Sequence, residues 1–316
     1  MRIGTLSLVG LLAVWGGCGD DDGGMDAGTD AGADTMVEMD TGGGDDAGAE
    51  TRSLTFSFTG LPVLGDEYVY EGWVIVDDAP VTTGRFTIDD AGALDPASFE
   101  LAADVVDAAT MFVLTIEPAT GDDPAPADTH VLAGPIASGS AMLTIGHMAA
   151  LGDDFSSAEG TFILATPSSA AADDDNQGIW FLTPGDPMTA GFTLPTLPAG
   201  WVYEGWIVDT SGAAPVPTST GRFTDVAAAD DDAGGPAAGP DATPSFPGQD
   251  FIDPATDLSD GHMAVLSIEP DPDDSPAPFQ LKPLGLPIGT DVGPGNPYTM
   301  NNIIGDNGIS GTATFE

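Results

Sequence analysis

Apolar and polar residues alternate along several short segments of this chain. Leu54, Phe56 and Phe58 are separated by hydroxyl residues, and a period of two places these three side chains on one face of a β-strand. Residues 68–76 and 201–208 are rich in the aromatic and β-branched side chains that strands favour. Because both segments carry apolar side chains on their two faces, we predict central strands that are covered on both sides.

Further apolar segments predict the remaining strands. They are residues 111–116, 142–145, 161–165, 179–182 and 264–268. Clusters of Gly, Pro and Asp lie between them, as is typical of tight turns. The chain has 27 prolines, which helix interiors exclude, and only residues 96–109 are compatible with a helix. The pattern therefore predicts an all-β fold of antiparallel β-sandwiches.

A repeated set of motifs divides the chain into two copies. Tyr70-Glu71-Gly72-Trp73 recurs as Tyr203-Glu204-Gly205-Trp206, Gly84-Arg85-Phe86-Thr87 as Gly221-Arg222-Phe223-Thr224, and Ile116-Glu117-Pro118 as Ile268-Glu269-Pro270. Both copies close with Gly-Thr and a phenylalanine strand, at residues 160–162 and 311–315. The order of the motifs is kept while their spacing grows, as loop insertions into a duplicated domain would produce. We predict two tandem domains, residues 53–170 and 171–316.

The N-terminus resembles the signal of bacterial lipoproteins. Arg2 precedes an apolar run over residues 3–15, which is followed by Gly16-Gly17-Cys18. The run is too short for a membrane-spanning helix, which needs about 20 apolar residues. The resemblance implies removal of residues 1–17 and acylation of Cys18. Trp15 stands where leucine is usual in that family, so an ordinary secretory signal with an incidental cysteine stays open.

Residues 18–52 predict a disordered acidic linker, because Asp, Gly and Ala dominate and little can be buried. The whole chain has 51 acidic and 5 basic residues, a formal net charge of −46. Such a charge would repel nucleic acid and anionic lipid. Gly19 follows the cysteine, where an aspartate would favour retention in the inner membrane. We therefore expect a lipid-anchored protein of the cell envelope, at the outer membrane rather than the inner.

Two charged pairs are the leading candidate site. Glu71 with Arg85, and Glu204 with Arg222, occupy matching places in the two copies, which predicts ion pairs across adjacent strands. Glu117 and Glu269 are rival partners for the arginines. A structural role that fixes strand register is favoured over a binding site. The aromatic residues beside these pairs are expected in the sandwich cores, with an exposed binding platform as the alternative; they are Tyr70, Trp73, Tyr203 and Trp206.

Metal and catalytic motifs are weak. Asp173, Asp175 and Gln177 lie in a segment that partly follows the start of a calcium loop, but Pro184 stands at the twelfth position, where a bidentate acid is expected. No metal and no cofactor is therefore predicted. No nucleophile–base motif, phosphate loop or dinucleotide motif occurs, so no catalytic residue is assigned and a non-enzymatic protein is expected.

The order Tyr-Glu-Gly-Trp-Val, Gly84-Arg85-Phe86 and Thr115-Ile116-Glu117-Pro118 is similar to the extracytoplasmic domain of anti-sigma-K factors of the RskA type. The resemblance implies a β-sandwich module of a sensor-like kind and does not imply sigma-factor binding. We predict a monomeric binding, sensing or structural envelope module. Its expected partners are the lipid bilayer, through the acylated N-terminus, and an envelope protein or glycan. An enzyme acting on envelope polymer or carbohydrate and a calcium-stabilised adhesin-like module are the alternatives.

Overall fold

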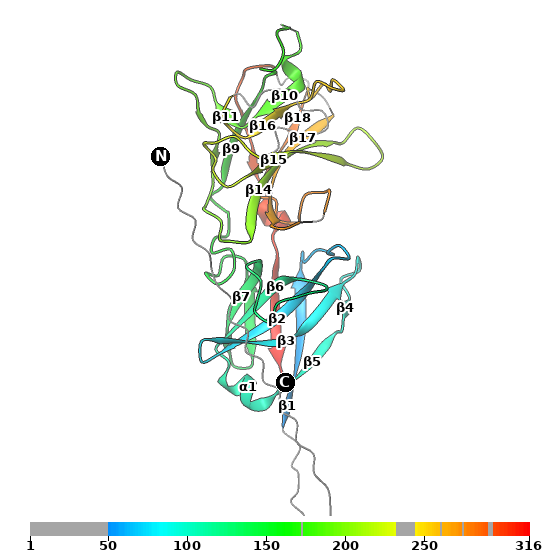
Figure 1. Ribbon diagram of the computed structural model, residues 1–316, viewed down its shortest axis with the longest axis vertical. Coiled ribbons are helices and arrows are strands. Elements are labelled where there is room, and N and C mark those ends of the chain that lie inside the picture. The colour runs from blue at the N-terminus through cyan, green and yellow to red at the C-terminus, as the bar shows by residue number, and fades with distance from the viewer. Residues whose placement is uncertain (1–49, 172, 232–243, 260, 274, 290–292) are drawn as a thin grey trace, which may run out of the picture. The chain divides into compact units, whose positions relative to one another are not determined.

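The computed structural model describes residues 50–171, 173–231, 244–259, 261–273, 275–289 and 293–316 (Figure 1). The predicted signal, Cys18 and nearly all of the predicted linker lie outside these residues. The first strand begins at Thr51, inside the predicted linker. All of the described residues belong to one compact unit. No helix among the described residues is both long and apolar enough to cross a membrane.

Nine strands build the first sandwich. They are β1 (Thr51–Thr59), β2 (Tyr68–Val76), β3 (Ala79–Ile88), β4 (Leu94–Asp95), β5 (Ser98–Ala102), β6 (Met111–Pro118), β7 (His130–Ala137), β8 (Ser140–Thr144) and β21 (Ser310–Phe315). They form one sheet in the order β4-β3-β2-β6-β7-β8-β21-β1-β5. The short helix α1 (Ala103–Ala108) lies within the segment expected to allow a helix.

Within the described parts of the chain, twelve strands build the second sandwich. They are β9 (Glu159–Leu164), β10 (Gly178–Trp180), β11 (Leu182–Thr183), β12 (Thr189–Ala190), β13 (Phe192–Thr193), β14 (Trp201–Asp209), β15 (Val216–Phe223), β16 (Gly248–Asp250), β17 (His262–Pro270), β18 (Leu284–Ile288), β19 (Tyr298–Thr299) and β20 (Asn301–Asn302). One sheet has the order β15-β14-β17-β18-β20, and another has the order β13-β9-β10-β16, with β19 also paired to β9. A 3₁₀ turn (Asp175–Gln177) and helix α2 (Ile304–Asn307) complete the set. The all-β fold is confirmed, and every strand pair named here is antiparallel.

Aromatic side chains hold both cores in the same way. The ring of Phe86 on β3 stacks on Tyr70 at 5.6 Å and on Phe58 at 5.8 Å. In the second sandwich the ring of Phe223 stacks on Tyr203 at 5.7 Å and on Phe192 at 5.6 Å. Each tyrosine hydroxyl also donates a 2.7 Å hydrogen bond to the carbonyl of a proline eight residues earlier. These prolines belong to Leu61-Pro62 and Leu194-Pro195, which occupy matching places in the two copies, so the repeated Leu-Pro and Tyr residues report core packing.

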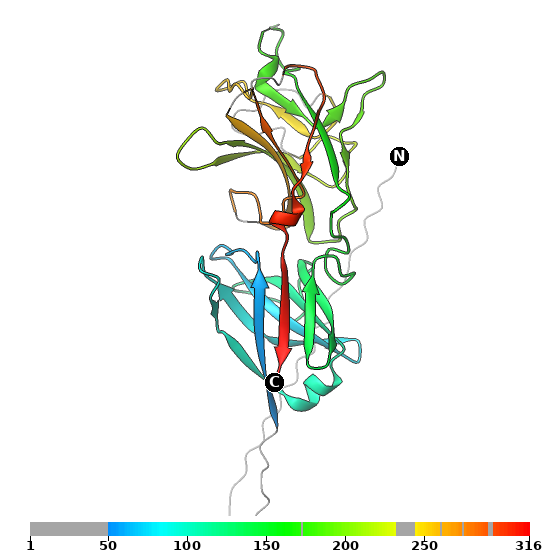
Figure 2. The same cartoon turned by 180° about the vertical axis from the view of Figure 1, so that it is seen from behind.

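The closing strands of the two copies are exchanged. β9 ends the first copy in sequence, yet it pairs with β13, β10 and β19 of the second sandwich. β21 ends the second copy, yet it lies between β1 and β8 of the first sandwich (Figure 2). The predicted division at residue 170 separates the sequence copies, but the sandwiches do not follow it, because each one is completed by a strand of the other copy.

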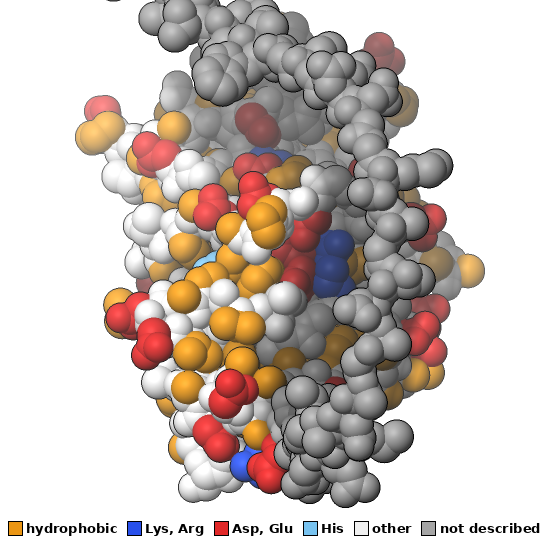
Figure 3. All heavy atoms as spheres, turned by 60° about the horizontal axis from the view of Figure 1, so that its bottom comes forward, with side chains coloured by type: hydrophobic (Ala, Val, Ile, Leu, Met, Phe, Trp, Pro, Cys, Tyr) orange, Lys and Arg blue, Asp and Glu red, His pale blue; other side chains and the backbone are white. Residues whose placement is uncertain are grey.

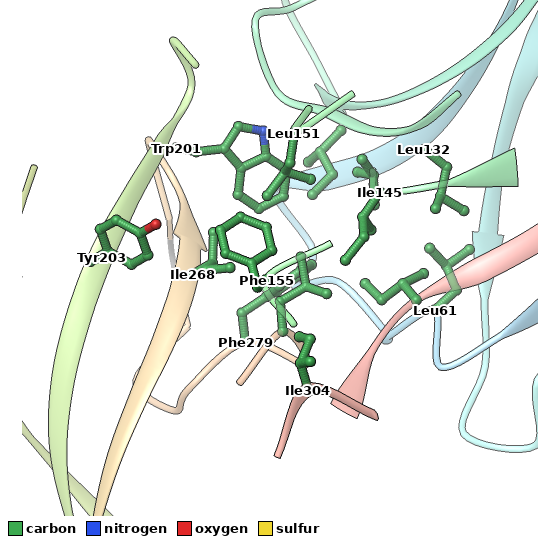
Figure 4. Packing of buried hydrophobic residues seen from close by; sticks show 14 of the residues in the cluster. Leu61, Leu132, Ile145, Leu151, Phe155, Trp201, Tyr203, Ile268, Phe279 and Ile304 are labelled. Carbon is green, nitrogen blue, oxygen red and sulfur yellow. The ribbon is translucent and has the colours of Figure 1, made fainter. Parts of the chain in front are cut away.

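Apolar residues from both sandwiches form one continuous buried cluster (Figure 4). Leu61 and Leu132 belong to the first sandwich, and Trp201 and Phe279 to the second. Phe155, in the segment that leads from β8 to β9, is fully buried in the same cluster. The exchange of strands and this shared core tie the two sandwiches together.

Candidate functional site: a repeated glutamate–arginine cluster

The predicted ion pairs lie on the face of each sheet that is turned away from the main core. Along β2, Tyr70 and Val74 point into the core, so Glu71 and Trp73 point to the opposite face. Glu71 stands directly opposite Arg85 on β3 and Thr115 on β6. Loops cover this face, and the Glu71 side chain is only 7 % exposed. A row of polar groups is thereby placed in a largely dry environment.

In the first copy Arg85 lies between two carboxylates. Its Nε atom is 3.2 Å from Oε2 of Glu71, and its Nη2 atom is 3.6 Å from Oδ2 of Asp122. Nη2 also donates to the carbonyl of Pro118. The second oxygen of Glu71 accepts a hydrogen bond from the hydroxyl of Thr82. The guanidinium fork is thus shared by a strand and the loop that follows β6.

The second copy repeats this arrangement with shorter distances. Arg222 Nε donates to Glu204 Oε2 at 2.9 Å, and Arg222 Nη2 donates to Asp273 Oδ2 at 3.0 Å. Ser219 takes the role of Thr82 and donates to Oε1 of Glu204. Burial raises the pKa of Glu204, against the lowering effects of the Ser219 hydroxyl and the Arg222 charge.

The rival partners, Glu117 and Glu269, have other donors. Glu117 accepts from the hydroxyl of Thr115 and, at 2.8 Å, from the backbone N–H of Ala127. Glu269 accepts from the hydroxyl of Ser267 and from the backbone N–H of Phe279 at 2.9 Å. Both glutamates are buried, and burial raises the pKa of each, for Glu269 to about 7. They anchor the loops after β6 and β17. Arg85 is left to Glu71 and Asp122, and Arg222 to Glu204 and Asp273.

The two tryptophans extend the polar row. Trp73 Nε1 donates to Thr115 Oγ1 at 2.9 Å, and Trp206 Nε1 donates to Ser267 Oγ at 2.7 Å. Both indoles are 3 % exposed, so neither forms an open platform. Trp73 is buried, and it packs with Val113 in a small hydrophobic cluster that is separate from the larger one. The reason is strand alternation, because a residue three places after Tyr70 must face the other way.

Three carboxylates of the second copy could in principle hold a metal ion. Oxygen atoms of Glu204, Glu269 and Asp273 all lie within 4.8 Å of one another. Arg222 already binds Glu204 and Asp273 and supplies positive charge there. The arrangement therefore suits a guanidinium better than a dication. Asp173, Asp175 and Gln177 are not part of any such group within the described ranges.

Sequence reasoning missed six members of the two clusters: Asp122, Asp273, Thr115, Ser267, Thr82 and Ser219. A signal existed, because Asp122 and Asp273 lie in the Pro-rich turn that both copies share, and Thr115 and Ser267 stand two residues before the repeated glutamates. The chain has so many aspartates that no single one stood out. The hydroxyl residues differ between the copies, which hid their common role.

A polar groove lies away from these clusters, beside β9 of the second sandwich. Its volume is about 620 Å³. Hydroxyl side chains of Ser156, Thr161, Thr193 and Thr299 line it, and Glu159 is the one charged residue among the described residues of its wall. Groups of this kind can exchange hydrogen bonds with neutral polar ligands.

Glu269 gives the second copy a predicted pH response. Below about pH 4.5 its carboxyl group is protonated in the folded and the unfolded chain. As the pH rises towards 7 the unfolded chain releases this proton first, so the free energy of unfolding falls by at most about 3 kcal/mol. We expect Glu269→Gln to weaken that fall, since glutamine keeps an oxygen for the Ser267 and Phe279 donors and does not ionise.

Urea denaturation at pH 5 and pH 8 measures this effect. Glu100→Gln is the control, because Glu100 is exposed on β5. Its pH dependence should match that of the unaltered chain. Equal pH dependence for Glu269→Gln and the unaltered chain would contradict the assignment of a proton to Glu269.

The comparisons with known proteins identify one related family. The model of the family described as anti-sigma-K factor rskA, C-terminal, matches residues 28–135. The similarity inferred from the Tyr-Glu-Gly-Trp, Gly-Arg-Phe and Ile-Glu-Pro motifs of the first copy is thereby confirmed. No curated protein and no solved structure matches the chain. The match includes Glu71, Arg85 and Glu117, so one of the two clusters lies in the part that is similar to this family.

Proposed function

We propose that this chain is a lipid-anchored protein of the cell envelope, with two β-sandwich domains that act in binding or sensing outside the cytoplasm. One observation carries the proposal: the part of the chain with the first Glu–Arg cluster is similar to the C-terminal region of an anti-sigma-K factor. What is carried over is the sensor-like module in its extracytoplasmic setting. Sigma-factor binding is not part of the proposal.

The chemistry of the clusters supports a non-enzymatic role. In both copies the carboxylates are engaged by an arginine, by hydroxyls or by backbone N–H groups. Their charges therefore hold loops and strands together, and they do not converge on an open cavity as catalytic acids would. The same internal use in two copies is what a structural framework requires.

The anchor in this proposal is an acyl group on Cys18, the only cysteine of the chain. More than one acyl chain gives stable membrane attachment. Acidic side chains are spread over the face seen in Figure 3, where basic ones are few. Such a surface would be repelled by anionic headgroups, so the lipid would hold the protein while the domains stay in solution.

Cys18→Ser tests the anchor. We expect the full-length chain expressed in a Gram-negative host to incorporate a clickable palmitate analogue and to sediment with membranes. The Cys18→Ser chain should incorporate none and should appear in the soluble extracytoplasmic fraction. Thr5→Ser, within the apolar run, is the matched control and should behave like the unaltered chain. A soluble, unlabelled product from the unaltered chain would contradict the proposal.

Recognition of a neutral glycan is a second candidate function, favoured by the polar groove beside β9. Its hydroxyl lining with a single carboxylate suits an uncharged sugar better than an ionic ligand. Titration of the Cys18→Ser chain with cellohexaose, maltohexaose and N-acetylglucosamine oligomers tests it. Binding that is lost in Thr161→Val supports the candidate, and release of shorter sugars would instead indicate an enzyme. If none of the three probes gives binding heat or is cleaved, both glycan binding and glycan hydrolysis are contradicted.

A further inference from the structure

We propose that the slot between β1 and β8 is a strand-binding site that also accepts β21 from a second copy of this chain. In the structure the slot holds the chain's own segment Ser310–Phe315, which comes from the second sequence copy. The proposal goes beyond the function suggested above and does not depend on it. Its partner is defined chemically, as an extended segment with the same side-chain pattern.

The two slots of the molecule bind their closing strands in the same register. Phe58 of β1 stands opposite Gly311 of β21, and Phe192 of β13 stands opposite Gly160 of β9. On the other side, Thr312 pairs with Met142 of β8, and Thr161 pairs with Thr299 of β19. Both slots therefore align the glycine of a closing strand in the same backbone register, and the β21 strands of two molecules of this chain are identical.

Glycine makes each slot selective. A Cβ atom on Gly311 would lie 2.5 Å from the ring of Phe58, and a Cβ atom on Gly160 would lie 2.8 Å from Leu284 and 3.1 Å from the ring of Phe192. Any larger residue would displace these side chains. In β21, Ala313 and Phe315 lie two and four residues after Gly311, and both are buried in the core. The slot between β1 and β8 thus requires glycine, then a small residue, then an aromatic one, at alternate positions.

An unfilled slot would be unstable. β21 has a ladder partner on each side, so its removal would leave two free edges within the sheet and would uncover the site of Phe315. Free edges are templates for pairing with another strand. The closing strand of a neighbouring molecule would supply the same hydrogen bonds and the same side chains as the chain's own strand.

The connection to β21 makes an exchange between molecules feasible. A single segment, residues 303–309, leads from the second sandwich to β21, and it contains Gly305, Gly308 and the short helix α2. Two molecules that exchange β21 with each other satisfy both slots, which gives a closed dimer.

Cross-linking between differently labelled chains tests the proposal. In a Cys18→Ser background, Ser57→Cys is placed in one chain and Thr312→Cys in another, because residues 57 and 312 stand opposite each other. Side chains at such positions are about 5 Å apart at Cβ, within reach of a short bismaleimide. The two chains are unfolded in urea, mixed, refolded together at high concentration and treated with the reagent.

We expect a mixed cross-linked dimer on a denaturing gel, in excess over dimers of either chain alone. The double variant Ser57→Cys/Thr312→Cys, refolded at low concentration, should cross-link within one chain and thereby show that the pair reacts. Thr87→Cys with Thr312→Cys is the control, since Thr87 is exposed on β3 and pairs with Asp95. If the double variant reacts within the chain but the mixture gives no excess of mixed dimer, the proposal is overturned.

Discussion

Deletion of residues 310–316 should unfold the first sandwich while the second keeps its own closing strand. β21 supplies the central pairing between β1 and β8, and it buries Ala313 and Phe315. Loss of a buried phenylalanine alone costs about 3 kcal/mol or more, and the ladder hydrogen bonds are lost as well. A domain is stable by only about 5–15 kcal/mol in total, so we expect no folded first sandwich at room temperature.

Hydrogen exchange measured by mass spectrometry separates the two sandwiches. In the truncated chain, protection should be lost over β1, β2 and β6 of the first sandwich, and retained to a larger extent over β10 and β14 of the second. Unchanged protection of β1 and β8 would show that β21 is dispensable and would contradict the strand exchange seen in the structure.

Two peptides that cover residues 308–316, one unaltered and one with Gly311→Val, test whether the slot can be refilled from outside the chain. Added to the truncated chain, the unaltered peptide should restore protection of β1 and β8, because it carries the glycine and the phenylalanine that the slot requires. The same peptide with Gly311→Val should not restore protection, because a side chain at this position meets the ring of Phe58. Restoration by both peptides would mean that the slot binds any extended strand.

The individual strands could be predicted from the sequence, but their exchange could not. Period-two alternation and the repeated aromatic motifs depend on local packing, which is the same whichever molecule or copy supplies the last strand. Gly160-Thr161-Phe162 and the segment from Gly311 to Phe315 carry equivalent signals, so their partners are decided by the path of residues 145–158 and 303–309. Buried contacts such as Phe155 and Ile304 fix that path, and they involve residues far apart in the chain.

The repeated motifs allowed the Glu–Arg pairs to be predicted, but the high number of acidic residues concealed the aspartates that complete each cluster. Glu71 with Arg85, and Glu204 with Arg222, could be singled out because arginine is rare here and stood in matching places. The second carboxylate on each arginine could not, since 51 acidic residues offer candidates everywhere. Burial distinguishes Asp273 from its many exposed neighbours, and burial follows from the loop after β17, whose path the sequence pattern does not specify.

Arg222→Ala should lower the free energy of unfolding by about 3 kcal/mol at pH 8, the second large effect that we expect. The substitution removes the only cation in contact with Glu204 and Asp273 among the described residues, and the side chains of both acids are 5 % exposed. Removal of one partner from a buried pair leaves an uncompensated charge, which costs far more than the pair itself contributes. Arg52→Ala is the control, because Arg52 and Asp107 are 44 % and 66 % exposed, and we expect less than about 1 kcal/mol.

The pH dependence identifies the mechanism of that loss. Arg222 lowers the pKa of Glu204, which burial raises, so its removal lets the carboxyl group of Glu204 keep a proton at higher pH. At pH 8 the variant must hold an unpaired carboxylate, whereas near pH 4.5 the group is protonated and the deficit should shrink. Urea denaturation at both pH values measures the difference from the unaltered chain. A deficit of equal size at pH 4.5 and pH 8 would assign the loss to packing of the arginine stem and would contradict an electrostatic role. Arg85→Ala should give a smaller deficit at pH 8, because its two carboxylates lie farther from the guanidinium and Asp122 is more exposed than Asp273.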